Sequence, residues 1–505
     1  MKSSVGKGAF VLVVSGFICK LFGAFFRLPL TNILGIDGIG TFQMVMSLYS
    51  LALVLVSGGM TSSLAKLVSS SRASGDVQKL GGYLKKAVTF VLGVGLSLGV
   101  AFALLSNQIA SVQGGTSGGS NCYLLMIFLL PLGGLIGVCR GIIQGYEVMS
   151  PTAISQIIEQ ISKFAFGLIF AYFLSKSGQG AGVFGAFLGI VLSEILALAY
   201  LFFAMGKTKI KPNNTPVQKE FYSAVLPLTA GNAVLPLTHA IESLIIVALL
   251  TKTGLEASSA TALYGLQTGV VGTVLNFPLV ISLAFSISIL PKISYLSSQD
   301  DTIEQRNVIK KGFLVMWFFL IPMVFALVAM SKNLYAIIFP SVINDFSTLA
   351  QDLTLLGGFG IVLCAIMQLL LSILQAKGFF LHSCLFSLIG GSAKVLLLVI
   401  LTPLKGVGIY AIAISNIVLY SIVCVCALIY LKDVIRVDAI DLLLPLASAL
   451  IMFLVIKILL SFNAGLLWLL ACAIIGGSVY LVMAYPITKR ITLLLLSSIK
   501  KGHDA

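Results

Sequence analysis

Apolar runs about twenty residues long recur along this 505-residue chain almost from end to end. A helix needs about 20 apolar residues to cross the hydrocarbon core of a bilayer. Hydrophobic residues make up 58% of the chain and charged residues only 10%, which is typical of a polytopic all-α membrane protein. We predict fourteen spans, at residues 9–33, 40–65, 87–105, 122–143, 153–174, 183–205, 222–250, 262–290, 312–331, 353–376, 380–401, 407–431, 440–461 and 465–485.

Lysine and arginine collect in alternate loops, and this pattern predicts the orientation because such residues stay on the cytoplasmic side. The first loop of the basic set contains Lys66, Arg72, Lys79, Lys85 and Lys86. The opposite set contains only Lys176, Lys252, Lys332 and Lys405. Since the number of spans is even, we expect both termini in the cytoplasm. The net charge of +15 is therefore interpreted as an orientation signal, and we expect no nucleic-acid partner.

The two halves of the chain repeat. Gln144 precedes Lys163 by 19 residues, Gln375 precedes Lys394 by the same interval, and each lysine lies well inside an apolar run. The repeat shifts the chain by six spans, so its copies share one topology and should be related by an axis along the membrane normal. We predict an N-terminal lobe at residues 1–205, a cytoplasmic linker at 206–221, a C-terminal lobe at 222–431, and two added spans with a cytoplasmic tail at 432–505.

Several cations lie inside predicted spans. Lys20 and Arg27 are seven residues apart, which places them on one helical face about 10 Å apart. A cation at membrane depth usually faces a protein interior or a water-filled cavity, although Arg27 could instead reach the outer headgroups. With Lys163 and Lys394 these residues predict a cavity between the lobes that binds a phosphate-type anion. Arg140 is a further anion candidate, and pinning the adjacent loop is its alternative role.

The acidic residues inside the spans are candidates for ion coupling. Glu159 precedes Lys163 by four residues, the favourable order for an ion pair on one face. Glu194 has no cation one turn away, and His239 with Glu242 forms a candidate proton-titrating pair. The eight cysteines have no metal-ligand spacing. We expect no metal and no cofactor, and coupling to the membrane potential, H⁺ or Na⁺.

Three motifs make a more specific resemblance. RGIIQGYEVMSPTAISQIIEQ at residues 140–160, KLFG at 20–23 followed by Arg27, and SILQAKG at 372–378 resemble the stage V sporulation protein B and MurJ-like branch of the multidrug, oligosaccharidyl-lipid and polysaccharide (MOP) exporter superfamily. The resemblance implies two six-helix lobes with two C-terminal helices. It also implies a flippase that moves an undecaprenyl-pyrophosphate-linked saccharide, such as lipid II or a related cell-wall precursor, across the bacterial plasma membrane.

In that family Lys20 and Arg27 match basic positions of the first helix that engage the pyrophosphate. The partners that the resemblance implies are a lipid-linked saccharide and membrane lipids, and the oligomeric state stays open. Two alternatives remain: an exporter of small molecules or drugs, and a membrane glycosyltransferase or polymerase. The second would need a catalytic acid or base, commonly on a sizeable loop near one surface. We find no such loop and predict a transporter rather than an enzyme.

Overall fold

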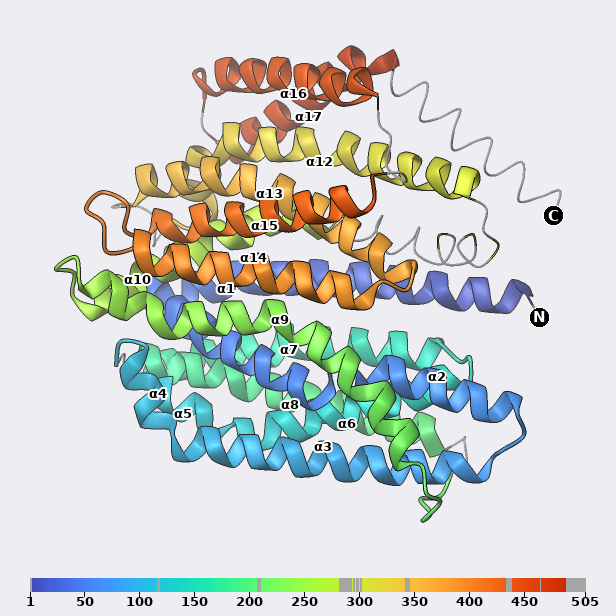
Figure 1. Ribbon diagram of the computed structural model, residues 1–505. Helices are drawn as coiled ribbons and strands as arrows, with labels where there is room; N and C mark the ends of the chain where they lie inside the picture. The colour runs from blue at the N-terminus through green and yellow to red at the C-terminus, as the bar shows by residue number, and fades with distance from the viewer. Residues whose placement is uncertain are drawn as a thin grey trace. The chain divides into compact units, whose positions relative to one another are not determined.

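The computed structural model describes residues 2–115, 119–206, 210–280, 293, 296, 299, 302–340, 346–432, 438–463 and 465–486. Their regular structure is helical (Figure 1), which confirms the predicted all-α class. The helices of the first half are α1 (Lys2–Ser57), α2 (Met60–Ala73), α3 (Gln78–Leu104), α4 (Ser106–Val112), α5 (Gly119–Leu124), α6 (Met126–Gly145), α7 (Ser150–Ser175) and α8 (Gln179–Met205). They are followed by α9 (Gln218–Thr251), α10 (Ala257–Gly265), the π-helix η2 (Leu266–Val271), α12 (Thr302–Ile338), α13 (Ser347–Ala376), α14 (Phe380–Leu401), α15 (Tyr410–Tyr430), α16 (Ala439–Leu460) and α17 (Leu466–Met483).

Thirteen helical segments of the described chain are long and apolar enough to cross a membrane. The first, Val14–Ala73, has 60 residues, and at 1.5 Å per residue its length of about 90 Å suffices for two crossings. Gly35 divides this segment, since its φ of 71° lies in the left-handed region that favours glycine. The segments therefore account for the fourteen predicted spans. Residues 281–290 of the predicted eighth span and 487–505 of the predicted tail lie outside the described residues.

The helices form two compact units, which we call the N-terminal unit (residues 1–270 with 395–411) and the C-terminal unit (271–394 with 412–505). In the N-terminal unit α1 packs against α7, α9 and α10, and α6 packs against α2, α3 and α8. The predicted lobe boundaries at residues 205 and 222 stay a prediction.

Helices α7 and α8 pack closely against each other, and glycines allow this contact. A Cβ added at Gly189 would lie 2.3 Å from the Cα of Gly167, and one added at Gly185 would lie 2.5 Å from the carbonyl oxygen of Phe170. Small residues four positions apart permit this close approach of two helix backbones. The contact fixes the relative position of two helices that carry charged residues, Lys163 on α7 and Glu194 on α8.

The core of the N-terminal unit joins α1 to α8 through aromatic rings. Phe42 lies 6.4 Å from Phe26 and 5.2 Å from Phe187, measured between ring centroids, and all three residues are buried. Offset and edge-to-face ring pairs of this kind add to the free energy gained from burying apolar surface. Phe26 is thereby held one residue before Arg27, and this anchors the polar face of α1.

In the C-terminal unit the last two helices pack on α12. The hydroxyl of Tyr480 donates a hydrogen bond to the carbonyl of Phe318 at 2.8 Å. The indole of Trp317 donates one to the carbonyl of Leu442 at 3.2 Å. These bonds satisfy polar groups that have no water partner inside a bilayer, so α16 and α17 are integral parts of this unit.

Candidate anion-binding and ion-coupling site

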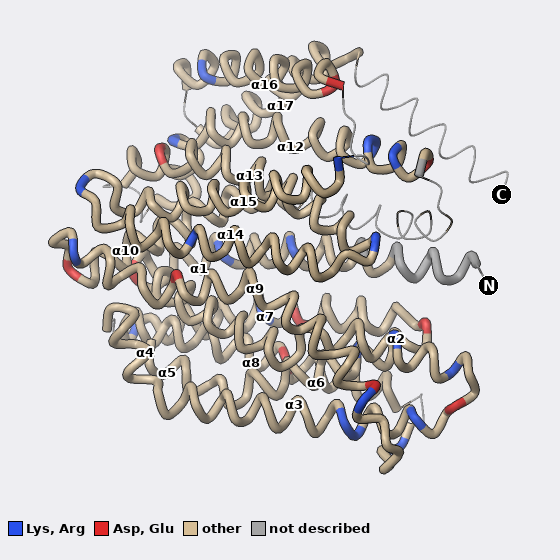
Figure 2. Tube along the Cα trace, in the orientation of Figure 1, with Lys and Arg blue, Asp and Glu red and all other residues tan. Residues whose placement is uncertain are grey.

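Most charged residues lie near the ends of helices, and a few lie part-way along them (Figure 2). Lys20 and Arg27 belong to the second group. Helix α1 is continuous between them, so the two side chains leave it on the same face. Lys20 is exposed and Arg27 is partly buried. This face of α1 is the cationic stripe that the seven-residue spacing predicts.

The opposite face of α1 lines an apolar groove of about 560 Å³. Phe22, Phe25 and Pro29 contribute to it from α1, and Phe164 contributes from α7. Phe22 and Phe164 are in edge-to-face contact, with ring centroids 6.2 Å apart. One helix therefore presents positive charge on one face and an apolar groove on the other.

Lys163 projects from α7 toward α1. Its Nζ lies 5.4 Å from the centroid of the Phe26 ring, a cation–π contact, and the charges of Arg27, Glu159 and Glu194 act on it. Within the described part of the chain, no carboxylate lies within 4.0 Å of the side-chain nitrogens of Lys20, Arg27 or Lys163. Two of these cations, Arg27 and Lys163, thus lie near each other without an ion-pair partner.

The predicted ion pair between Glu159 and Lys163 is wrong, because Glu159 pairs with Arg140. Arg140 Nη2 donates to Glu159 Oε2 at 2.8 Å, and Arg140 Nε donates to Ser155 Oγ at 3.0 Å. The side chains of Arg140 and Glu159 are 15% and 25% exposed. The turn between α6 and α7 brings the arginine to the face of Glu159, and a geometry with two bonds from one guanidinium is stronger than a lysine contact. Arg140 therefore connects α6 to α7, and its predicted role in anion binding stays a prediction.

Glu194 lies on α8 and is 5% exposed. The hydroxyl of Tyr49, on α1, donates a hydrogen bond to Glu194 Oε1 at 2.5 Å. Glu194 is an isolated acid in the sequence, and its partner Tyr49, which is 145 residues away along the chain, was not predicted. Glu194 has no cation one helical turn away in the sequence. This was the only sequence feature to indicate that its partner lies on another helix.

His239 and Glu242 lie together on α9, as predicted, with Nδ1 and Oε2 4.0 Å apart. The histidine side chain is 50% exposed and that of the glutamate 3%. Lys394, on α14, belongs to the C-terminal unit and is fully buried there. The roles of these three residues in coupling and in anion binding stay predictions.

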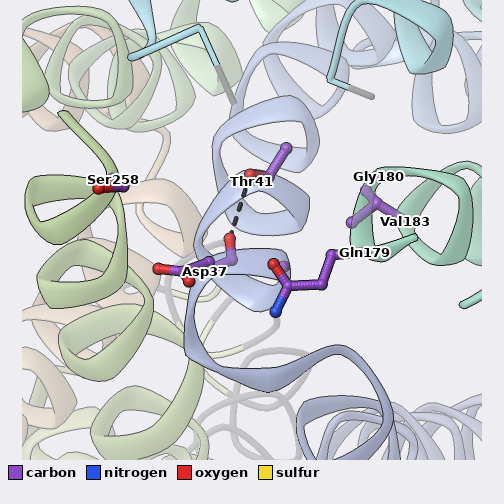
Figure 3. A pocket seen from close by; sticks show the side chains of 7 residues that line it. Asp37, Thr41, Gln179, Gly180, Val183 and Ser258 are labelled. Carbon is purple, nitrogen blue, oxygen red and sulfur yellow. Dashed lines mark hydrogen bonds between the residues drawn. The ribbon is translucent and has the colours of Figure 1, made fainter. Parts of the chain in front are cut away.

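A polar pocket that sequence analysis missed lies where α1 meets α8 and α10. Its volume is about 230 Å³, and Asp37, Thr41, Gln179 and Ser258 line it (Figure 3). Thr41 Oγ1 donates to the carbonyl of Asp37 at 3.1 Å, as the dashed line in the figure marks. The sequence feature that could have indicated this pocket is Asp37, an acid two residues after Gly35 and just before an apolar run.

Beside this pocket the backbones of α1 and α10 meet at glycines. A Cβ added at Gly40 would lie 2.3 Å from the carbonyl oxygen of Thr261, and one added at Gly265 would lie 2.2 Å from the carbonyl oxygen of Ile36. Gln43 Nε2 also donates to the carbonyl of Thr268 at 3.3 Å. We call this region the α1–α10 contact.

Comparison with known proteins places the chain in a family. The family model described as "Polysaccharide biosynthesis protein" matches residues 5–297, which is more than half of the chain. The chain belongs to this polysaccharide biosynthesis protein family. This family member is 28% identical over 307 residues to stage V sporulation protein B of Bacillus subtilis, in an alignment that covers 58% of each chain. It is 23% identical over 376 residues to the lipid II flippase MurJ of the same organism, covering 68% of this chain and 67% of that protein.

Solved structures show the same fold. The inward closed conformation of the lipid II flippase MurJ matches with a TM-score of 0.75 at 16% identity, covering 96% of this chain and 100% of that one. An inward-facing MATE family multidrug transporter of the MOP superfamily matches with a TM-score of 0.67 at 11% identity, covering 84% and 98%. The predicted resemblance and fold are thereby confirmed. In sequence, the alignment spans less than two thirds of stage V sporulation protein B.

Proposed function

We propose that this family member is a flippase for a lipid-linked saccharide precursor, which it passes across a bacterial plasma membrane by alternating access. The observation that carries the proposal is the set of cations on α1 and α7, Lys20, Arg27 and Lys163, which have no carboxylate within 4.0 Å among the described residues. Positive charge at membrane depth without a counter-ion is costly, and a pyrophosphate would offset this cost. We propose undecaprenyl pyrophosphate as the carrier lipid and cytoplasmic locations for both termini.

The apolar groove on α1 supports a lipid rather than a water-soluble anion. Phe22, Phe25 and Phe164 line it, and its volume of about 560 Å³ is large enough to hold part of a hydrocarbon chain. The phosphate head of a lipid would bind the cationic stripe, and its hydrocarbon tail would lie along the groove. The lipid would then contact both faces of α1. Cationic drugs, the substrates that a multidrug exporter could carry, would be repelled by the same stripe, so we do not favour that alternative.

Alternating access requires contacts that open and close in turn. The second half of α1 contacts α10 at Gly40, and the residues that follow its C-terminal end contact α9 at Gly59. Asn232 Nδ2 donates to the carbonyl of Gly58 at 2.7 Å, and the N–H of Gly59 donates to Thr229 Oγ1 at 3.1 Å. We propose that these two contacts are the gates. The membrane potential contributes about 2.3 kcal/mol per charge moved through 100 mV, enough to bias such an equilibrium.

Loss of the cationic stripe tests the proposal. In cells that depend on this protein, Lys20→Ala and Arg27→Ala are each expected to reduce outer-leaflet labelling of the precursor at least about tenfold, because a charge-assisted contact contributes about 1.5–3 kcal/mol. The precursor should accumulate in the inner leaflet. Lys457→Ala is the matched control, since that lysine lies on α16 of the C-terminal unit with its Nζ over the Phe453 ring. Normal labelling by both stripe variants at normal expression would refute the proposed role.

A further inference from the structure

Glu194 is a buried carboxyl group of the N-terminal unit that the proposed anion site leaves unexplained. It is 5% exposed, and Tyr49 donates to its Oε1. Its other oxygen, Oε2, is shielded from solvent and has no hydrogen-bond partner among the residues that the structure describes. A buried carboxylate usually accepts several hydrogen bonds or pairs with a cation, and here half of the group has neither.

The surroundings of Glu194 come from three neighbouring helices. Helix α1 supplies Tyr49, and α6 supplies Gly133, where an added Cβ would lie 3.6 Å from Glu194 Oε1. The charged groups that act on the carboxyl are Arg140 of α6 with Glu159 and Lys163 of α7. Within the described residues none of the cationic nitrogens lies within 4.0 Å of Glu194. Arg140 is already engaged by Glu159, whose own negative charge opposes ionisation of Glu194.

These contacts favour the neutral form of the carboxyl. Removing an ion from water costs several kcal/mol even after a protein relaxes around it, and an unpaired buried group commonly neutralises instead. A proton bound to the carboxyl removes this cost and leaves the hydrogen bond from Tyr49 in place. We propose that Glu194 is a proton-binding site inside the N-terminal unit, occupied in this conformation and linked to anion binding at Arg27 and Lys163.

The link runs through Lys163, which is within electrostatic range of both Arg27 and Glu194. Without an anion, the positive charge of Lys163 favours loss of the proton from Glu194 to water. A phosphate bound at Arg27 and Lys163 cancels part of that effect, so the carboxyl holds its proton more tightly. By reciprocity, protonation of Glu194 strengthens anion binding. This step rests on the proposed function, whereas occupancy of Glu194 by a proton does not.

Infrared spectroscopy of the purified full-length protein in lipid nanodiscs, without ligand, tests the occupancy. The wild type at neutral pH is expected to show the carbonyl band of a protonated buried carboxyl, and Glu194→Gln is expected to lose it. Glu220→Gln, which removes an exposed glutamate at the start of α9, should keep the band. Tyr49→Phe should keep the band but shift its frequency because the hydrogen bond is lost. A band that Glu194→Gln retains, one that Tyr49→Phe leaves unshifted, or one that disappears on adding Na⁺ at constant pH would overturn the proposal.

Calorimetry tests the link separately. Farnesyl pyrophosphate is titrated into the wild type and Glu194→Gln at the alkaline pH where the infrared band of Glu194 has fallen to half of its intensity. Buffers of different ionisation enthalpy then give the number of protons taken up per anion bound. The probe's own ionisation contributes equally to both proteins, so the wild type should show the larger uptake. Equal uptake would overturn the link. If neither protein binds the probe while the infrared band is present, the proton site stands and the proposed anion site fails.

Discussion

Glu159→Ala is expected to destabilise the N-terminal unit by about 3 kcal/mol, because it leaves the guanidinium of Arg140 buried without its counter-ion. That guanidinium is 15% exposed and would keep only its bond to Ser155. Arg140→Ala should have a similar effect, since it strands the carboxylate. Unfolding of the purified protein can be followed with a thiol-reactive dye, because Cys139 is buried next to Arg140. Both tryptophans, Trp317 and Trp468, lie in the C-terminal unit, so their fluorescence reports on that unit separately.

The double variant Arg140→Ala with Glu159→Ala distinguishes a true pair from two independent contributions. It should lose clearly less stability than the sum of the single variants, because no charge is left without a partner. Lys79→Ala is the matched control: Lys79 pairs with Glu220 at 3.0 Å, and these side chains are 32% and 49% exposed. Solvent screens an exposed pair of this kind, so its loss should change the stability little. Additive losses in the double variant would contradict a coupled pair between α6 and α7.

The fourteen spans could be predicted because the bilayer imposes a length on every crossing. That constraint acts on composition alone and needs no knowledge of contacts. The course of the chain between spans is set by other forces. The predicted spans 9–33 and 40–65 belong to one continuous segment interrupted at Gly35. Pro227 and Pro236 lie inside the continuous helix α9. Neighbouring helices can satisfy the backbone groups that proline frees, and the sequence does not reveal them.

The site was predictable only where its geometry is local. The seven-residue spacing places Lys20 and Arg27 on one face of α1 whatever surrounds it. The four-residue spacing of Glu159 and Lys163 gave the wrong partner, because Arg140 approaches from another helix with better geometry. Tyr49 could not be assigned to Glu194 at all, since that bond depends on how α1 packs against α8. Pairing across helices is decided by tertiary packing, which overrides spacing within one helix.

Gly265→Ala is expected to force α1 and α10 apart. Its new Cβ would lie 2.2 Å from the carbonyl oxygen of Ile36, a backbone atom that no rotamer change can move away. Overpacking of this kind costs about 1–3 kcal/mol, which corresponds to roughly a 5- to 150-fold smaller population with this contact closed. If the α1–α10 contact must close once in every transport cycle, outer-leaflet labelling of the precursor should fall by a similar factor. Maleimide labelling of Thr41→Cys, at a position that is now 5% exposed, should rise in parallel.

Gly40→Ala should reproduce both effects, because its Cβ would lie 2.3 Å from the carbonyl oxygen of Thr261 in the same contact. Gly93→Ala on α3 is the control for helix propensity, since an added Cβ there meets nothing within 4 Å. The variant with both Gly40→Ala and Gly265→Ala decides whether one contact is responsible. Once the first methyl group has separated α1 from α10, the second costs little, so the combined loss should be clearly smaller than the sum. If the Gly40→Ala and Gly265→Ala variants match Gly93→Ala in both transport and maleimide labelling, opening and closing of the α1–α10 contact is not part of the transport cycle.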